Sequence, residues 1–156
     1  MEMEQSSSVA PGQGPGATRV PEMHSRTFHL MRRVLQEHGA HWQGRLPHLT
    51  KPQYAVLRAV GEQPGIEQSA VAVSAGIDKA TLAAVLLRLE QRGLIVRTVD
   101  LADRRRRLVH LTDEGDREIR HTFPVAAEVD AVLLDRLTPK ERTQLQHLLT
   151  KLTDTP

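Results

Sequence analysis

Residues 94–111 read LIVRTVDLADRRRRLVHL, and this stretch decides the fold. Apolar and β-branched residues dominate 94–99 and 108–111, which is typical of short strands. Between them, residues 100–107 are mostly polar and end in four consecutive arginines. The stretch therefore predicts a β-hairpin with a strongly basic tip.

The four arginines, Arg104, Arg105, Arg106 and Arg107, indicate a polyanionic partner. Like charges crowded at one exposed tip repel one another unless an anion neutralises them. A charged run is often only a solvated loop, but the segment that precedes this one favours nucleic acid. Arginine suits the minor groove of DNA, where the negative potential is concentrated.

The segment upstream of the hairpin has the spacing of a helix-turn-helix. Residues 68–74 form a short apolar segment, and Ala75-Gly76 interrupts it. Asp78 is placed to cap a second helix that runs to about residue 91. The apolar residues of this helix predict one inward face, formed by Leu82, Val85, Leu86 and Leu89. Its N-terminal end would enter the major groove.

Helices are also predicted on both sides of this lobe. Residues 25–44 carry apolar residues at three- and four-residue spacing, and Thr138 with Glu141 forms a capping box for a last helix. The fold class is therefore mostly α with a small β-hairpin wing. A single small lobe leaves the apolar faces of the end helices uncovered, so we expect a second copy to cover Leu145, Leu148, Leu149 and Leu152.

Composition excludes several classes of function. The chain has 156 residues, enough for one domain, and no cysteine, so disulfides, thiolate metal sites and thiol redox switches are excluded. It has too few aromatic residues for a single-strand stacking platform. Ser-His-Asp order, a phosphate-binding glycine loop and paired carboxylates in an apolar setting are all absent from the sequence. We expect no enzyme, no catalytic residue and no cofactor.

Residues 1–23 are rich in serine, glycine and proline, and we expect a disordered tail there. They lack the basic start and apolar run of a secretory signal. The sequence has no run of 18 apolar residues, the length that a membrane span needs. We expect a cytoplasmic protein without a membrane partner.

Residues 50–115 resemble the winged helix-turn-helix of the MarR family of bacterial transcription regulators. The resemblance is carried by Leu89-Glu90-Gln91-Arg92-Gly93-Leu94-Ile95-Val96-Arg97 and, most strongly, by Asp103-Arg104-Arg105 followed by Val109-His110-Leu111-Thr112-Asp113-Glu114-Gly115. It implies a DNA-binding lobe over 49–112 and dimerisation helices over 24–48 and 113–156. It also implies a homodimer on a pseudo-palindromic operator in double-stranded DNA.

The resemblance also implies roles for individual residues. Arg105 matches the wing arginine that enters the minor groove, and Asp103 matches the carboxylate that holds it. The neighbouring arginines would be phosphate contacts or structural pairs. On the recognition helix the exposed polar candidates are Lys79, Thr81 and Arg88. Ala83 and Ala84 stand where many relatives have a Ser/Thr-Arg pair, so base reading there is limited to methyl contacts with thymine.

Without a thiol, the family's remaining route of regulation is a small ligand, often an aromatic carboxylate. The branch that this chain resembles implies a repressor that responds to aromatic-acid catabolites, with hydroxynicotinate-like compounds as the specific expectation. Stacking and hydrogen-bonding candidates from the residues themselves are His38, His41, Trp42, His48 and Tyr54, with Arg58 or Arg26 to pair with the anion.

Two alternatives stay open at this point. A winged helix can serve as a protein-interaction module that binds no DNA. His38 and His41 lie three residues apart and face nearly the same way, which would suit a metal-responsive regulator. No Asp, Glu or Cys pattern completes a ligand set around them, so we predict no metal site.

Overall fold

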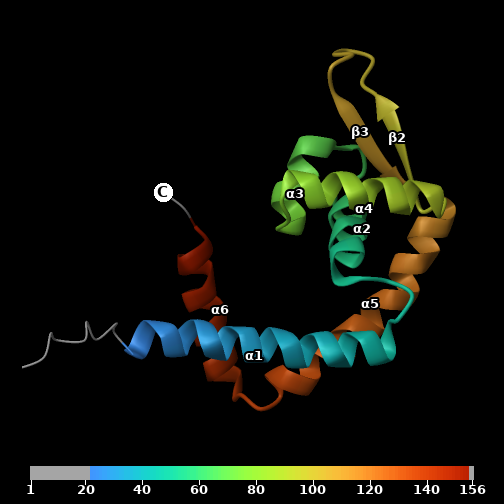
Figure 1. Cartoon of the computed structure of the whole chain (residues 1–156). Coiled ribbons are helices and arrows are strands. Elements are labelled where there is room, and N and C mark those ends of the chain that lie inside the picture. Colours follow the sequence, from blue (N-terminus) through green and yellow to red (C-terminus); the bar gives the residue numbers. More distant parts are fainter. Residues whose placement is uncertain (1–21, 155–156) are drawn as a thin grey trace, which may run out of the picture. The chain divides into compact units, whose positions relative to one another are not determined.

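The computed structural model describes the backbone of residues 22–154 and the side chains of residues 26–154. Within this range the chain is mostly helical, as predicted, with one small sheet (Figure 1). The elements are α1 (Glu22–Arg45), α2 (Lys51–Glu62), β1 (Ile66–Glu67), α3 (Gln68–Ala75), α4 (Lys79–Gln91), β2 (Ile95–Val99), β3 (Arg107–Leu111), α5 (Asp113–Leu134) and α6 (Pro139–Thr153).

The chain divides into two compact units, residues 1–33 and 34–156. In the first unit the described residues lie in α1, where Phe28 is 67% exposed. Since α1 begins at Glu22, residues 22–23 of the expected tail are helical. The rest of that tail lies outside the described residues. All candidate site residues except Arg26 lie in the second unit.

Helices begin at the residues that the sequence marks as caps. Thr50 and Thr138 each accept from a backbone N–H three residues on, and the glutamine or glutamate there returns a bond to the cap backbone. Asp78 accepts from the backbone N–H of Thr81, and Thr112 accepts from that of Gly115. Each cap satisfies amides that a helix leaves without an internal partner. The helix starts predicted at Asp78 and Thr138 are confirmed.

The core of the second unit lies under the helix-turn-helix. The predicted inward face of α4 is buried against α2, α3 and the sheet. The largest fully buried side chains of this core are Leu49, Val56, Leu57, Val60, Val71, Leu86, Leu89 and Val109. A smaller cluster forms around Trp42, where Leu46 of the following loop meets Ala126 and Val129 of α5. The larger cluster joins α2, α3, α4 and the sheet, and Tyr54 of α2 packs against both clusters.

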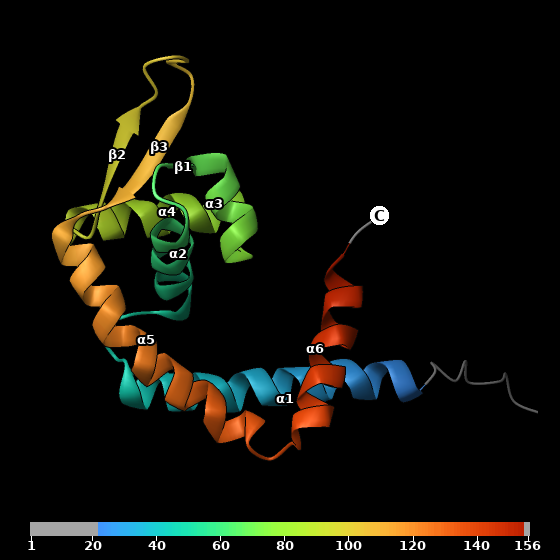
Figure 2. The ribbon, with the colours of Figure 1, turned by 180° about the vertical axis from the view of Figure 1, so that it is seen from behind.

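The sheet has one strand more than the predicted hairpin. β2 and β3 pair as expected, with Val99 opposite Arg107, and β1 pairs with the other edge of β3, with Glu67 opposite Leu108 (Figure 2). The two-stranded description was therefore incomplete. A strand of two residues is too short to show the alternation by which strands are recognised. β1 attaches the wing to the start of α3.

A left-handed glycine separates the two helices of the motif. Gly76 ends α3 with φ of 63°, and the Ile77 backbone N–H donates to Ala72 O at 3.0 Å. Glycine adopts this conformation without the steric cost that a Cβ brings. The helix axes of α3 and α4 turn by 107° at this break. In residues 22–154 no single helix is long and apolar enough to cross a membrane; only this bent pair reaches that length and composition together.

Candidate nucleic-acid interface

The outer face of α4 is open to solvent, as a recognition helix requires. Its buried residues are Leu82, Val85, Leu86 and Leu89, while the side that faces away from the core exposes Lys79, Ala83, Ala84 and Arg88. The exposed face thus offers two cations at its two ends and methyl groups between them. This face therefore carries few groups that could hydrogen-bond to base edges.

Thr81 is half-buried and already engaged in the helix cap. Its backbone N–H donates to Asp78 Oδ1 at 2.9 Å and its hydroxyl donates to Asp78 Oδ2 at 2.5 Å. These hydrogen bonds, led by the one from the hydroxyl, hold the pKa of the Asp78 carboxyl below its usual value. The proton of the Thr81 hydroxyl is committed to the cap, so only its oxygen lone pairs remain to accept a further hydrogen bond.

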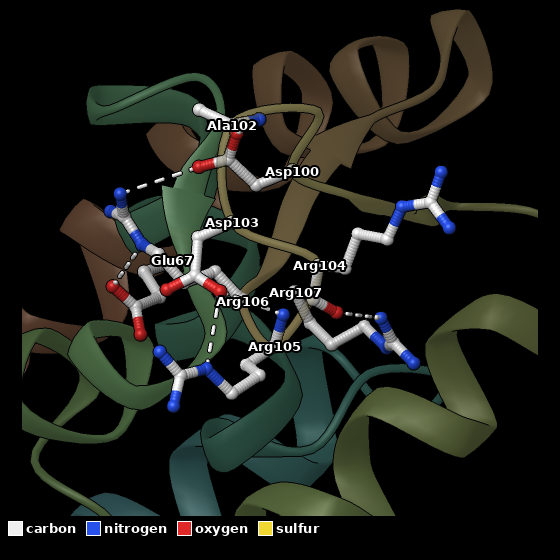
Figure 3. A network of polar contacts seen from close by, with 8 residues as sticks. All are labelled: Glu67, Asp100, Ala102, Asp103, Arg104, Arg105, Arg106 and Arg107. Carbon is white, nitrogen blue, oxygen red and sulfur yellow. Dashed lines mark hydrogen bonds and ion pairs between the residues drawn. The ribbon is translucent and has the colours of Figure 1, made fainter.

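The wing tip is folded by two local carboxylate turns. Asp100 Oδ1 accepts from the Ala102 backbone N–H at 2.9 Å, and Asp103 Oδ1 accepts from the Arg105 backbone N–H at 3.0 Å. Asp103 Oδ1 also lies 3.4 Å from Arg105 Nε. The Arg105 side chain is nevertheless 94% exposed. Asp103 thus orients Arg105 through its backbone N–H and its Nε, while most of the arginine side chain stays exposed to solvent (Figure 3).

The other three wing arginines have different surroundings. The Arg104 side chain points away from the wing and forms no ion pair with the described residues. Arg107 Nη1 donates to the Arg104 carbonyl oxygen at 3.2 Å, which leaves its charge uncompensated by a carboxylate. Arg106, in contrast, lies between two carboxylates, Glu67 and Asp100. The four consecutive arginines therefore differ in whether a carboxylate neutralises their charge.

One hollow joins the wing to the helix-turn-helix. It has a volume of about 290 Å³ and is lined from α4 by Lys79, from the wing by Arg105 and Arg107, and around the start of α3 by Glu67, Gln68 and Ser69. Three cations thus converge from separate elements on one concave surface, which also holds the Glu67 carboxylate that is paired with Arg106. Such a surface suits the oxygens of a phosphodiester backbone.

The base of the wing is fixed by contacts that the sequence did not single out. Glu90 Oε2 accepts from Arg97 Nη2 at 2.5 Å, which ties the end of α4 to β2. The Thr112 hydroxyl donates to Gly93 O at 2.6 Å. Gly115 approaches Leu94 so closely that a Cβ on it would lie 1.9 Å from Leu94 O. No short motif signals these contacts, because their partners lie 7 to 21 positions apart along the chain.

Three of the candidate ligand-binding rings lie in a row. The ring centroids of His38 and Trp42 are 6.1 Å apart, and those of Trp42 and Tyr54 are 5.1 Å apart. Trp42 is only 4% exposed, and its Nε1 donates to Leu49 O at 2.7 Å. Tyr54 is half-buried, and this burial raises the pKa of its phenol above the ordinary 10.0, so it is a hydrogen-bond donor at neutral pH.

Arg58 lies beside Tyr54 and shares a hollow with it. The hollow, of about 280 Å³, is lined by Tyr54, Ala55, Arg58, Ala59, Glu62 and Ser74. The Arg58 guanidinium is paired with Glu62, whose hydrogen bond raises the pKa of Arg58, and it lies 5.5 Å from the centre of the Phe123 ring. An incoming anion at Arg58 would compete with Glu62. Arg26 is exposed on α1.

The remaining histidine candidates contact carboxylates. His41 Nε2 lies 4.0 Å from Glu37, and His48 Nε2 lies 3.0 Å from Glu118. Both ring nitrogens of His38 are engaged, Nδ1 with Lys51 Nζ at 3.4 Å and Nε2 with Asp130 Oδ1 at 2.8 Å. Within residues 26–154 no three His, Cys, Asp or Glu side chains are grouped so as to hold a metal ion. The geometry supplies no support for the metal-responsive alternative.

The last helix presents its apolar face to solvent. α6 has no buried residue, and Leu145, Leu148, Leu149 and Leu152 are between 38% and 71% exposed. Leu145 and Leu148 line a hollow of about 460 Å³ whose other walls include Leu133, Leu134 and Leu137. An apolar surface of this kind is typical of a contact with another protein.

A solvent-facing helix of a helix-turn-helix beside an arginine-bearing hairpin defines a winged-helix DNA-binding protein. Residues 49–106 match the model of the MarR family. The chain is also 45% identical over 133 residues to the transcriptional regulator HosA of Escherichia coli, a match that spans 85% of this chain and 98% of HosA. This chain belongs to the MarR family of transcriptional regulators.

Solved structures of the same kind superpose on most of the chain. The PcaV regulator of Streptomyces coelicolor, in complex with its natural ligand, has a TM-score of 0.78 and 34% identity, and the match covers 92% of this chain and 99% of PcaV. BpsR of Bordetella bronchiseptica, whose DNA binding is regulated by 6-hydroxynicotinic acid, has a TM-score of 0.76 and 35% identity over 83% of this chain and 99% of BpsR.

Proposed function

We propose that this regulator is a homodimeric repressor that binds a pseudo-palindromic operator and leaves it when a small aromatic carboxylate binds. The observation that carries the DNA-binding part is the hollow shared by Lys79, Arg105 and Arg107, because it brings charges from the recognition helix and the wing to one surface. In this proposal residues 49–112 are the DNA-binding lobe, residues 24–48 and 113–156 are the dimer layer, and the protein acts in the cytoplasm.

On DNA, the N-terminal end of α4 would lie in the major groove and the wing in the neighbouring minor groove. Lys79 and Arg88 would contact phosphates at the two ends of α4, with Ala83 and Ala84 against thymine methyl groups between them. Arg104 and Arg107 would add phosphate contacts from the wing. Much of the specificity would then come from groove shape, which arginine reads through minor-groove width.

The experiment that identifies the operator is enrichment from a pool of random duplexes on the purified full chain. We expect an inverted repeat whose half-sites lie about one helical turn apart, because two recognition helices of a symmetric dimer enter successive major grooves. Enrichment of a single unrepeated site, or no enrichment over the starting pool, would contradict the proposal. The enriched duplex is the specific probe in the DNA-binding measurements below.

The dimer is supported by the uncovered leucines of α6 and the apolar hollow beside them. Leu149→Asp would place a charge among these leucines, and a buried unpaired charge is strongly unfavourable. We expect this variant to elute as a monomer on a sizing column where the wild type elutes as a dimer. His147→Asp, on the opposite face of the same helix, adds the same side chain and should remain dimeric. A dimer that persists in Leu149→Asp would place α6 outside the interface.

Two observations support an aromatic carboxylate as the effector: the ligands of the two similar structures, and the chemistry around Tyr54. BpsR responds to 6-hydroxynicotinic acid, and PcaV was solved with its natural ligand. Here the phenol of Tyr54 can donate to a ring substituent, and Arg58 can bind a carboxylate if it releases Glu62. His38 and Trp42 lie along the same row of rings. A ligand at this place acts only through different affinities for the DNA-bound and free arrangements of the dimer.

We expect 6-hydroxynicotinic acid to release the chain from the enriched duplex in a fluorescence-polarisation titration. Arg58→Gln should raise the acid concentration for half-release by about tenfold or more, because it removes a hydrogen bond to a charged group. Arg120→Gln, at an exposed arginine of α5 outside the candidate ligand-binding residues, is the control and should respond as the wild type does. 6-Hydroxynicotinamide, which lacks the carboxylate, should be inactive. Equal release by the acid and the amide would contradict a site built on anion binding.

A further inference from the structure

We propose that Arg106 is a positioning residue of the wing and binds no phosphate, unlike the arginines beside it. This inference rests on the proposed contact between the wing and DNA, and it divides the four arginines by task. Its basis is the ion-pair cluster of Glu67, Arg106 and Asp100, which joins the wing to the start of α3 (Figure 3).

Each end of the Arg106 guanidinium has its own carboxylate. Arg106 Nε donates to Glu67 Oε2 at 3.0 Å, and Arg106 Nη1 lies 3.3 Å from Asp100 Oδ2. The backbone of Arg106 is held as well, because its N–H donates to Asp103 O at 2.9 Å and its carbonyl accepts from the Asp100 N–H at 3.2 Å. Arg106 is therefore fixed in both its main chain and its side chain.

The charge of this cluster argues against a phosphate contact. Two carboxylates share one guanidinium, so the cluster has a formal net charge of −1. The side chains are only partly exposed, 47% for Arg106, 35% for Glu67 and 17% for Asp100, which limits screening by water. A phosphate that approached the Arg106 guanidinium itself would meet both carboxylates, whereas Lys79, Arg105 and Arg107 in the hollow that Glu67 also lines have no such pair of carboxylates around them. A phosphate at Arg104, which has no such partner among the described residues, would meet none.

The Glu67 side chain contacts the wing and not the helix that it begins. Glu67 is the N-cap residue of α3, and its side chain makes no hydrogen bond to the amides of that helix. Here it reaches a residue 39 positions away instead. The bond attaches the loop just before β3 to the start of the helix-turn-helix, and in this proposal it sets the direction in which Arg105 projects.

The test compares three variants on two duplexes, the enriched one and one of random sequence. Arg106→Gln and Glu67→Ala each remove the attachment of the wing, and Arg104→Gln is the matched arginine control. Binding constants are measured over a range of salt concentrations, and thermal midpoints verify that each variant is folded. The slope of log affinity against log salt counts phosphate contacts, at about 0.9 for each contact.

We expect Arg106→Gln to weaken binding to the enriched duplex by about three- to tenfold, the range of a lost network contact, with an unchanged salt slope. Arg104→Gln should reduce the slope by about 0.9 for each subunit in the complex. Glu67→Ala should weaken binding to the enriched duplex although it deletes a negative charge, and should leave affinity for the random duplex equal or higher.

A salt slope that falls in Arg106→Gln as it does in Arg104→Gln would overturn the inference and make Arg106 a phosphate contact. Tighter binding of Glu67→Ala to both duplexes would also overturn it, since simple charge removal would then explain the effect. If Arg106→Gln does not fold, Glu67→Ala alone decides between the two accounts. A wild type that shows no preference for any enriched duplex would instead overturn the proposed function itself.

Discussion

Gly115→Ala is expected to destabilise the chain by about 2 kcal/mol, despite the better helix propensity of alanine. The new Cβ would lie 1.9 Å from Leu94 O and 2.9 Å from Leu94 C, both backbone atoms. Leu94 O also accepts from the Thr112 N–H at 3.1 Å, so it cannot retreat without a broken bond. Forcing atoms into such a site costs about 1–3 kcal/mol and occasionally more, against a gain of about 1 kcal/mol from propensity.

The measurement is urea unfolding at one fixed protein concentration, because the stability of a dimer depends on concentration. Gly44→Ala is the control, since a Cβ at Gly44 of α1 meets nothing within 4 Å. It should be neutral or stabilising by up to about 1 kcal/mol. The clash at Gly115 also lies where β2 and α5 begin, so the wing should tilt and DNA affinity should fall further. If Gly115→Ala is as stable as the wild type, the close approach of Gly115 to the Leu94 backbone does not constrain the fold.

Arg105→Ala is expected to weaken binding to the enriched duplex by about 1–3 kcal/mol for each wing, the range of a specific arginine contact. The Arg105 side chain is 94% exposed, so the substitution removes few contacts from the free protein other than the one with Asp103. Gel-shift or polarisation titrations should show the loss without a change in the unfolding midpoint. Arg120→Ala removes an exposed arginine of α5 and should leave affinity unchanged.

Asp103→Ala tests whether Asp103 orients Arg105 on DNA, because charge removal alone and loss of orientation predict opposite changes in affinity. A negative charge beside DNA opposes binding, so its simple removal should strengthen binding. Asp103 instead orients Arg105 through bonds to its backbone N–H and its Nε, and we therefore expect weaker binding. Tighter binding of Asp103→Ala, or unchanged binding of Arg105→Ala, would remove the wing tip from the interface.

Much of the fold could be predicted because its signals are local. The cap of α4 lies within four residues, Asp78 to Thr81, and the left-handed Gly93 follows directly on the end of that helix. The inward leucines of α4 repeat at helical spacing, and the β-branched residues of 94–99 predict β2. Such features depend on near neighbours, and a reader of the sequence sees those neighbours together.

The contacts that tune the wing could not be predicted in the same way. Glu67 and Arg106 are brought together by the pairing of β1 with β3, and β1 is too short to be recognised. Arg104 and Arg106 look equivalent in a run of arginines, and only the fold shows that one is neutralised by carboxylates. Trp42 could have been a stacking ring or a core residue, and its bond to Leu49 O places it in the core.

The claim at the centre of this account is that the wing and α4 lie against a phosphodiester backbone. The most direct measurement is the affinity of the wild-type chain for the enriched duplex across a salt series. With six to ten phosphates contacted, affinity should fall by about 10³ or more between 50 and 200 mM salt. A nearly flat response would contradict the claim and favour a winged helix that binds another protein.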